Sequence, residues 1–233
     1  MKTSFVALTF AFLVSLVSPA IAAEAGFVRL DNGKDLTGWK GDLTYWSVED
    51  GALTAKTTKD GKLTQEKYNT FLVWQGGQPA DFELRAKYKI VGGNSGIQYR
   101  SRVIDEAKFI VSGYQADIDS SPSYTGMNSE ERARAILAER GQKVTIGADG
   151  KKETEKFGSA EELQTKVKNE DWNEYRIVAK GNHLQHYVNG VLMSEVIDNQ
   201  KDKAATSGVI ALQAHAGFTM TIQFKDIELK ELK

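Results

Sequence analysis

The stretch FELRAKYKI, residues 82–90, decides the fold class because its side chains alternate strictly between apolar and charged. One face of the predicted strand carries only apolar side chains, those of Phe82, Leu84, Ala86, Tyr88 and Ile90. The other face is entirely charged. A period of two residues is typical of an antiparallel strand with one face on a core and the other in water. The stretch therefore predicts a β protein.

Similar patterns recur along the chain. Residues 46–56 predict a strand, an Asp-Gly turn and a second strand, and residues 183–196 predict a hairpin about Asn189-Gly190. Further strands are predicted at 174–180, 208–213 and 219–232. In the last of these, the apolar positions change parity near Lys225-Asp226, which predicts a β-bulge.

One segment departs from the alternation. Residues 128–141, NSEERARAILAERG, begin with capping residues and early glutamates and end in Arg-Gly, so they predict a short helix inserted between strands. We see no internal repeat and no flexible linker, and we expect one domain over residues 27–232. The fold class that follows is an all-β two-sheet sandwich or jelly roll. Periodicity alone does not separate these from a barrel.

The first residues have the form of a secretory signal peptide. An early Lys2 precedes an apolar run from Phe5 to Val17, and small residues follow at Ala20–Ala22. The run is shorter than the roughly 20 apolar residues that a spanning helix needs. We expect residues 1–22 to be removed and the remaining chain to be periplasmic or secreted, without a membrane span.

Composition excludes several classes of function. The formal charge of -1 becomes -1 - 1 = -2 without Lys2, which gives no argument for binding nucleic acid. The chain has no cysteine, so it has neither a thiolate metal site nor a thiol nucleophile. A domain of this size can bury enough core to fold without disulfides. The sequence leaves the oligomeric state open.

A first polar cluster is GGNSGIQYRSR, residues 92–102. Its glycines are explained by a hairpin turn, in which Asn94 offers further hydrogen bonds. Arg100 and Arg102 share parity with Gln98 and would line one polar face. An arginine fork suits carboxylates or sugar hydroxyls, but exposed arginines are common on strands. On its own the cluster favours the plain hairpin.

A second cluster lies in residues 112–126, SGYQADIDSSPSYTG. Gln115, Asp117 and Asp119 alternate with apolar residues, so the two carboxylates point to one side of a strand, about 7 Å apart. Such a pair can hold a hard cation, or raise one pKa for acid–base work. A solvated edge strand or a turn cap at Asp119 explains the pattern equally well.

A third cluster is LQAHAGFTM, residues 212–220, where Gln213 and His215 share parity at the end of a strand. A histidine beside a strand end and a glycine is a candidate base or ligand. His186 falls on an apolar face and is expected to be a buried, hydrogen-bonded histidine. Of the three histidines in the chain, His215 is our candidate for chemistry.

Taken together, these segments resemble a bacterial domain family. The motifs occur in family order: LDNGKDLTGWK (30–40), WSVEDGAL (46–53), the stretch 82–102, GYQADID (113–119), DWNEYRIVAKGNHLQHYVNG (171–190) and GVIALQAHAG (208–217). The family, formerly domain of unknown function 1080, is that of the 3-keto-disaccharide hydrolases or 3-keto-glucoside lyase/hydratases. The resemblance covers about residues 27–232. It implies a concanavalin- or laminin-G-like jelly roll with a carbohydrate substrate already oxidised at carbon 3.

The resemblance also assigns roles. It implies that Asn94 and Arg100 hold substrate hydroxyls or an enolate, together with Gln115 and Gln213. His215, Asp117 and Asp119 become candidate catalytic residues, or ligands of a divalent metal ion that would polarise the ketone. Many members carry Glu at the position of Gln115, so a role that needs that carboxylate does not transfer. The arginines at 132, 134 and 140 are expected to cover the cleft.

The leading hypothesis is an exported enzyme that cleaves 3-keto-glycosides by hydrolysis or by elimination and hydration. A non-catalytic carbohydrate-binding module on the same sandwich is the alternative, and a surface adhesion or scaffold domain is a third. Convergence of Asn94, Arg100 and the polar residues of the other two clusters in one cleft favours an enzyme. In particular, Asn94 and Arg100 are expected to face His215.

Overall fold

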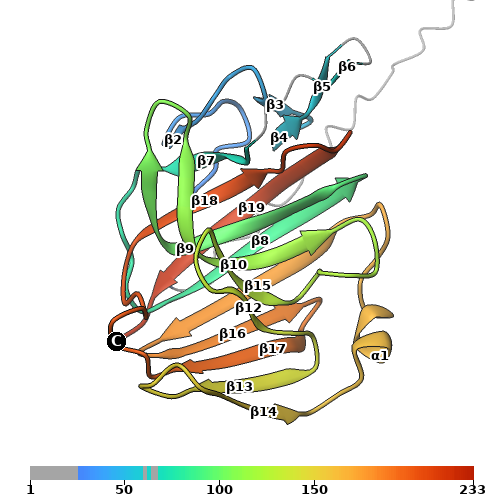
Figure 1. Cartoon of the computed structure of the whole chain (residues 1–233). Coiled ribbons are helices and arrows are strands. Elements are labelled where there is room, and N and C mark those ends of the chain that lie inside the picture. The colour runs from blue at the N-terminus through green and yellow to red at the C-terminus, as the bar shows by residue number, and fades with distance from the viewer. Residues whose placement is uncertain (1–25, 60–61, 64–67) are drawn as a thin grey trace, which may run out of the picture.

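The computed structural model describes residues 26–59, 62–63 and 68–233, and these form two β-sheets that pack face to face (Figure 1). The expected signal peptide at residues 1–22 lies outside the described residues. Within them, no helix is long and apolar enough to cross a membrane.

The larger sheet has the strand order β14-β13-β17-β16-β15-β8-β19-β4-β3, with β1 beside β19. Its strands are β1 (Val28–Arg29), β3 (Trp46–Glu49), β4 (Ala52–Lys56), β8 (Phe82–Val91), β13 (Gln142–Ile146), β14 (Lys152–Lys156), β15 (Asn173–Lys180), β16 (His183–Val188), β17 (Val191–Asp198) and β19 (Thr221–Glu231).

The smaller sheet has the strand order β12-β11-β10-β9-β18-β7-β2. Its strands are β2 (Trp39–Lys40), β7 (Thr70–Trp74), β9 (Asn94–Asp105), β10 (Ile110–Asp119), β11 (Asn128–Glu131), β12 (Ala135–Ala138) and β18 (Val209–Ala214). A separate two-stranded ribbon pairs β5 (Thr58–Lys59) with β6 (Lys62–Leu63).

The alternation that predicted the strands matches their burial. On β8 the apolar residues are buried against the opposite sheet, and most of the charged residues between them are partly exposed. The predicted hairpins at Asp50-Gly51 and Asn189-Gly190 are present, with positive φ at all four residues. The predicted bulge also occurs, since the β19–β8 register shifts between Lys225 and Glu228.

The helix predicted at residues 128–141 is wrong. This segment forms β11 and β12, because β11 pairs with β10 from Gly113 to Ala116 and buries Asn128 beneath the sheet. These sheet contacts outweigh the helical propensity of the segment. The short helix of the fold is α1 (Ala160–Gln164), which begins at the capping side chain of Ser159.

The plain hairpin predicted for residues 92–102 is also wrong. β8 belongs to the larger sheet and β9 to the smaller one, so Gly92 and Gly93 carry the chain from one sheet to the other. Their φ values are +68° and +66°, which favour glycine. A Cβ at Gly92 would lie 2.5 Å from the carbonyl oxygen of Thr219. The turn therefore needs glycine and brings the start of β9 against residues 218–220.

The core between the sheets contains a buried polar group that is centred on His186. Its Nε2 lies 2.9 Å from the hydroxyl of Tyr99, which accepts a hydrogen bond from Asn128 Nδ2 at 3.0 Å. Burial lowers the pKa of His186 to about 3. His186 is therefore neutral and hydrogen-bonded inside the fold, as its place on an apolar face predicted.

Candidate functional site

A cavity of about 640 Å³ lies against the smaller sheet. On β10, Tyr114, Ala116 and Ile118 belong to the core between the sheets. Gln115, Asp117 and Asp119 therefore point to the outer face, where all three line the cavity. The other lining residues come from neighbouring strands and loops: Gly93, Asn94, Ser120, Ser121, Tyr124, Ser129, Glu130, Glu131, Arg132, Ala135, Ile136, His215 and Phe218.

Asp117 is the buried acid of this cavity, with 6% of its surface exposed. Its Oδ1 accepts hydrogen bonds from Gln115 Nε2 at 2.7 Å and from Ser129 Oγ at 2.9 Å. Burial raises the pKa of the Asp117 carboxyl to about 7, although these two hydrogen bonds lower it. A carboxyl with this pKa exchanges protons readily at neutral pH, which is the property of a general acid or base.

Gln115 holds Asp117 in place instead of facing the cavity as a free ligand. Its Oε1 accepts from Gln98 Nε2 at 2.7 Å and from Gln213 Nε2 at 3.1 Å, so its own Nε2 is left to donate to Asp117. Gly96 makes this arrangement possible, because a Cβ there would lie 2.6 Å from the Gln115 side chain. Gln213 itself is fully buried and does not line the cavity.

Asp119 and Asn94 form the end of the cavity where β9 begins. Asp119 Oδ1 accepts from the backbone N–H of Ser121 at 2.7 Å, and Oδ2 accepts a long 3.4 Å hydrogen bond from Asn94 Nδ2. The turn-cap interpretation of Asp119 is therefore correct, and the residue also contributes to the cavity wall. Asn94 keeps a second amide hydrogen for another partner.

His215 follows the last residue of β18 and lines the cavity from the opposite side of β9. Its Nδ1 lies 2.7 Å from the carbonyl oxygen of Ala216. Because a carbonyl only accepts, Nδ1 carries the hydrogen in this contact and Nε2 is left as the basic nitrogen. The ring lies 5.1 Å from that of Phe218, centroid to centroid.

The expected metal site is not present as a ligand cluster. Among the described residues, no three His, Cys, Asp or Glu side chains gather closely enough to hold a metal ion. Asp117 Oδ1 is already occupied by two hydrogen-bond donors, and the neighbouring position 115 is an amide. As arranged here, Asp117, Asp119 and His215 do not fit a metal centre, although all three line one cavity.

Arg100 does not face His215, contrary to expectation. Its φ is +45°, and the β9–β10 register shifts between Tyr99 and Arg102, so the strand bulges here and the parity with Gln98 is lost. The buried guanidinium donates to the carbonyl oxygens of Ala80 and Gly181 at 2.7 and 2.6 Å, and forms an ion pair with Asp81 at 2.9 Å. Arg100 therefore joins the two sheets away from the cavity.

Of the three arginines expected over the cleft, one lies at the cavity and two have structural contacts elsewhere. Arg132 lines the cavity. Arg134 forms ion pairs with Glu130 and Asp198, and Arg140 donates to the backbone carbonyls of residues 122, 125 and 160. The last two therefore hold loops and strands together.

Sequence reasoning missed several lining residues. Ser129 and Glu131 were hidden by the wrong helix, whereas their alternation on a strand would have placed both on one face. Tyr124 and Phe218, which line the cavity while 45% and 44% exposed, lie in loops with no periodic signal. None of the four tryptophans lines the cavity, and both Trp39 and Trp46 are buried in the core.

Comparison with known structures supports the fold. A proposed glycosyl hydrolase from Parabacteroides distasonis superposes with a TM-score of 0.58 at 20% identity, covering 88% of this chain and 99% of that one. The carbohydrate-binding module CBM66 from Bacillus subtilis gives 0.54 at 14% identity, covering 83% and 96%. A galectin-like protein of unknown function, also from Bacillus subtilis, gives 0.58 at 10% identity, covering 88% and 94%. The expected all-β jelly-roll sandwich is confirmed.

Curated proteins provide no match to this chain. A family model does match, over residues 26–230, which is nearly the whole of the described fold. The chain belongs to the family of 3-keto-alpha-glucoside-1,2-lyase-like domains.

Proposed function

We propose that this protein is an exported carbohydrate-active enzyme that cleaves 3-keto-glycosides by elimination across carbons 1 and 2. The observation that carries the proposal is that Asp117 and His215 line one cavity from strands separated by β9. Two strand spacings are roughly 10 Å, which leaves room for one sugar ring between the two side chains. The family membership supplies the class of substrate.

The 3-keto group makes this elimination accessible. The ketone acidifies the hydrogen on carbon 2, so a moderate base can remove it and leave the electrons as an enolate on the oxygen of carbon 3. The enolate then expels the oxygen on carbon 1, and that oxygen leaves as an alcohol once it gains a proton. The products are a sugar with a double bond between carbons 1 and 2 and the free alcohol. Addition of water to the double bond would complete a net hydrolysis.

The side chains divide these proton transfers between them. His215 accepts the proton from carbon 2 at Nε2, the nitrogen left free by the contact of Nδ1 with Ala216. Asp117 gives its proton to the departing oxygen, because its raised pKa of about 7 keeps the acid form populated at neutral pH. Asn94 directs its second amide hydrogen to the enolate oxygen or to a sugar hydroxyl. Once the products leave, His215 gives its proton to solvent and Asp117 takes one from solvent, which restores the starting state.

The test is incubation of the purified protein, without residues 1–22, with 3-keto-trehalose and with methyl 3-keto-α-glucoside. Release of the alcohol, with an absorbing unsaturated ketone or its hydrate as the other product, is the expected result. His215→Ala and Asp117→Asn should each lower kcat by about 100-fold or more.

Saturable sugar binding that survives both substitutions, with no product from either substrate, would instead indicate the non-catalytic carbohydrate-binding module. CBM66 shows that a related sandwich is used in that way.

A further inference from the structure

We propose that the hairpin of β11 and β12 is the subsite for the leaving group, and that it selects a second sugar ring. This inference rests on the proposed function, and it assigns residues of this chain to the second ring of the disaccharide substrate that the family resemblance implies. The residues that define the hairpin subsite are Arg132, Ala135 and Ile136, all of which line the cavity.

The strand order fixes which way the leaving group points. Across the smaller sheet the order is β12-β11-β10-β9-β18, with Asp117 on β10 and His215 just after β18. If the oxidised ring lies over β9 between these two side chains, the oxygen protonated by Asp117 is on the far side of the ring from His215. The group attached to that oxygen then extends over β11 and β12.

The chemistry of the hairpin subsite matches a sugar ring. Ile136 is 38% exposed, although it is a large apolar residue, and it offers a surface for the C–H face of a ring. Arg132 lines the same cavity with its side chain 40% exposed, and its ion pair with Glu131 is long, at 3.9 Å. Its guanidinium therefore has hydrogens available for ring hydroxyls. A leaving group as small as a methyl group would contact neither Ile136 nor Arg132.

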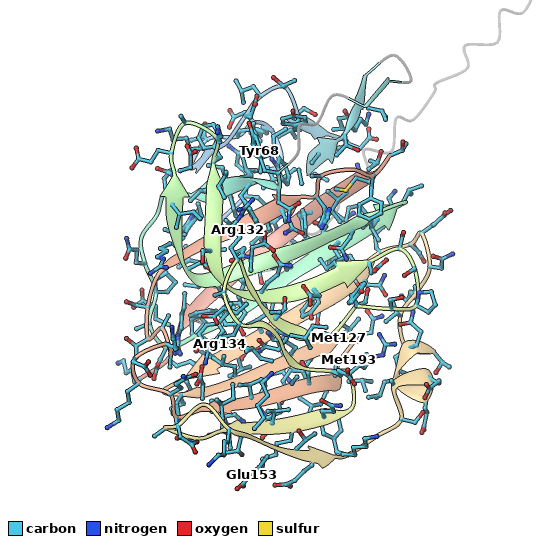
Figure 2. The ribbon with its side chains drawn as sticks, viewed as in Figure 1. Tyr68, Met127, Arg132, Arg134, Glu153 and Met193 are labelled. Atoms are coloured by element: carbon cyan, nitrogen blue, oxygen red, sulfur yellow. The ribbon has the colours of Figure 1, made fainter. Side chains whose placement is uncertain are left out.

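The hairpin subsite is held in a fixed shape. Arg132 and Ala135 have φ values of +55° and +58°, which are unfavourable for residues other than glycine and persist only where the surroundings enforce them. Arg134, between them, is anchored to Glu130 at 2.5 Å and to Asp198 at 2.6 Å. Figure 2 labels Arg132 and Arg134 and shows them well separated. The same turn therefore places Arg134 in its ion pairs and Arg132 at the cavity.

The experiment compares Arg132→Ala and Ile136→Ser with the unmodified protein on two substrates that share the oxidised ring. With 3-keto-trehalose we expect kcat/KM to fall about tenfold for each variant, the loss typical of one missing contact to a substrate group. With methyl 3-keto-α-glucoside we expect a change below about twofold. Arg102→Ala is the matched control, because Arg102 is an exposed arginine on β9 that does not line the cavity.

Two outcomes overturn the inference. An equal loss on both substrates would mean that the hairpin acts on the oxidised ring, and no loss on either would mean that it contacts no substrate. If the unmodified protein cleaves neither substrate, the proposed function fails, and calorimetry with trehalose then tests the hairpin alone. Equal affinity in Arg132→Ala and the unmodified protein would contradict the subsite, whereas about tenfold weaker binding would support it without any turnover.

Discussion

At the scale of single residues, Asp117 should control how activity depends on pH. The proposed acid must be protonated, and burial raises its pKa to about 7. We therefore expect kcat/KM to fall as pH rises through about 7. An ordinary aspartate would lose this activity near pH 4. A profile of kcat/KM from pH 5 to 9 with methyl 3-keto-α-glucoside measures it, and activity that does not fall above pH 7 would contradict the assignment of Asp117 as the acid.

The same carboxyl should make the folded protein less stable at higher pH. Its folded pKa is raised above that of the unfolded chain, so the folded state binds more protons between about pH 4 and 7. The free energy of unfolding therefore decreases as pH rises through this window and stays reduced above it. We expect Asp117→Asn to remove this decrease and to raise the free energy of unfolding at pH 8 by about 1–3 kcal/mol.

Urea unfolding at pH 5 and at pH 8 tests this prediction. Ser129→Ala provides a control, because it removes one donor to Asp117 and leaves the carboxyl in place. An Asp117→Asn variant that loses stability equally at both pH values would contradict the sign of the shift.

At the scale of elements, the bulge of β9 determines what Arg100 does. The side chain is 1% exposed and donates to Asp81 and to the carbonyl oxygens of two loop residues, so its removal loses these hydrogen bonds together with the packing of the buried side chain. We expect Arg100→Ala to lower the free energy of unfolding by about 3 kcal/mol. KM for the proposed substrates should change less than about twofold at temperatures where the variant is folded. Thermal unfolding and steady-state kinetics check both, with Arg102→Ala as the neutral control.

The sequence predicted the features that depend on neighbouring residues, and it did not predict those that depend on contacts between residues far apart in the chain. The alternation of β8 and the parity change at Asp226 are both carried by neighbouring residues, and both are confirmed. The bulge at Arg100 depends instead on close packing against Gly113 and Gly208, two positions where a Cβ would strike residues 100 and 101. No pattern within residues 92–102 contains that information.

The same distinction holds for the residues of the candidate site. Gln115, Asp117, Asp119 and His215 were chosen from strand parity and Asn94 from the family resemblance. The structure places all five at one cavity, with Gln213 behind it. The hairpin subsite was not predicted, because NSEERARA favours a helix until β10 offers it a pairing edge.

At the scale of the whole molecule, the two ends of the described fold meet. β1 pairs with β19, matching Val28 with Leu229, and a Cβ at Gly26 would lie 3.2 Å from the side chain of Lys230. A circular permutant that links Lys233 to Gly26 through a short glycine-rich linker should therefore fold. Opened at the exposed turn before Gly150, it should keep its kcat/KM within about threefold and lose about 1–2 kcal/mol of stability.

Activity assays and urea unfolding of the permutant test this, and loss of soluble folded protein would contradict it. Opening the chain at Gly92 is the informative contrast. That turn connects the two sheets and is packed against Thr219, so a break there should disrupt both β9 and the loop of Phe218.

The pairing of β8 with β19 also sets the direction in which the cavity would open when the protein is attached to something else. Glu231 lies opposite Phe82, whereas Thr221 lies opposite Val91, two residues before the cavity residue Gly93. These positions are the two ends of the ten-residue strand β8, which lie roughly 30 Å apart. A tether, tag or surface joined at the Glu231 end would hold the domain with its cavity pointing outward, open to sugars diffusing past.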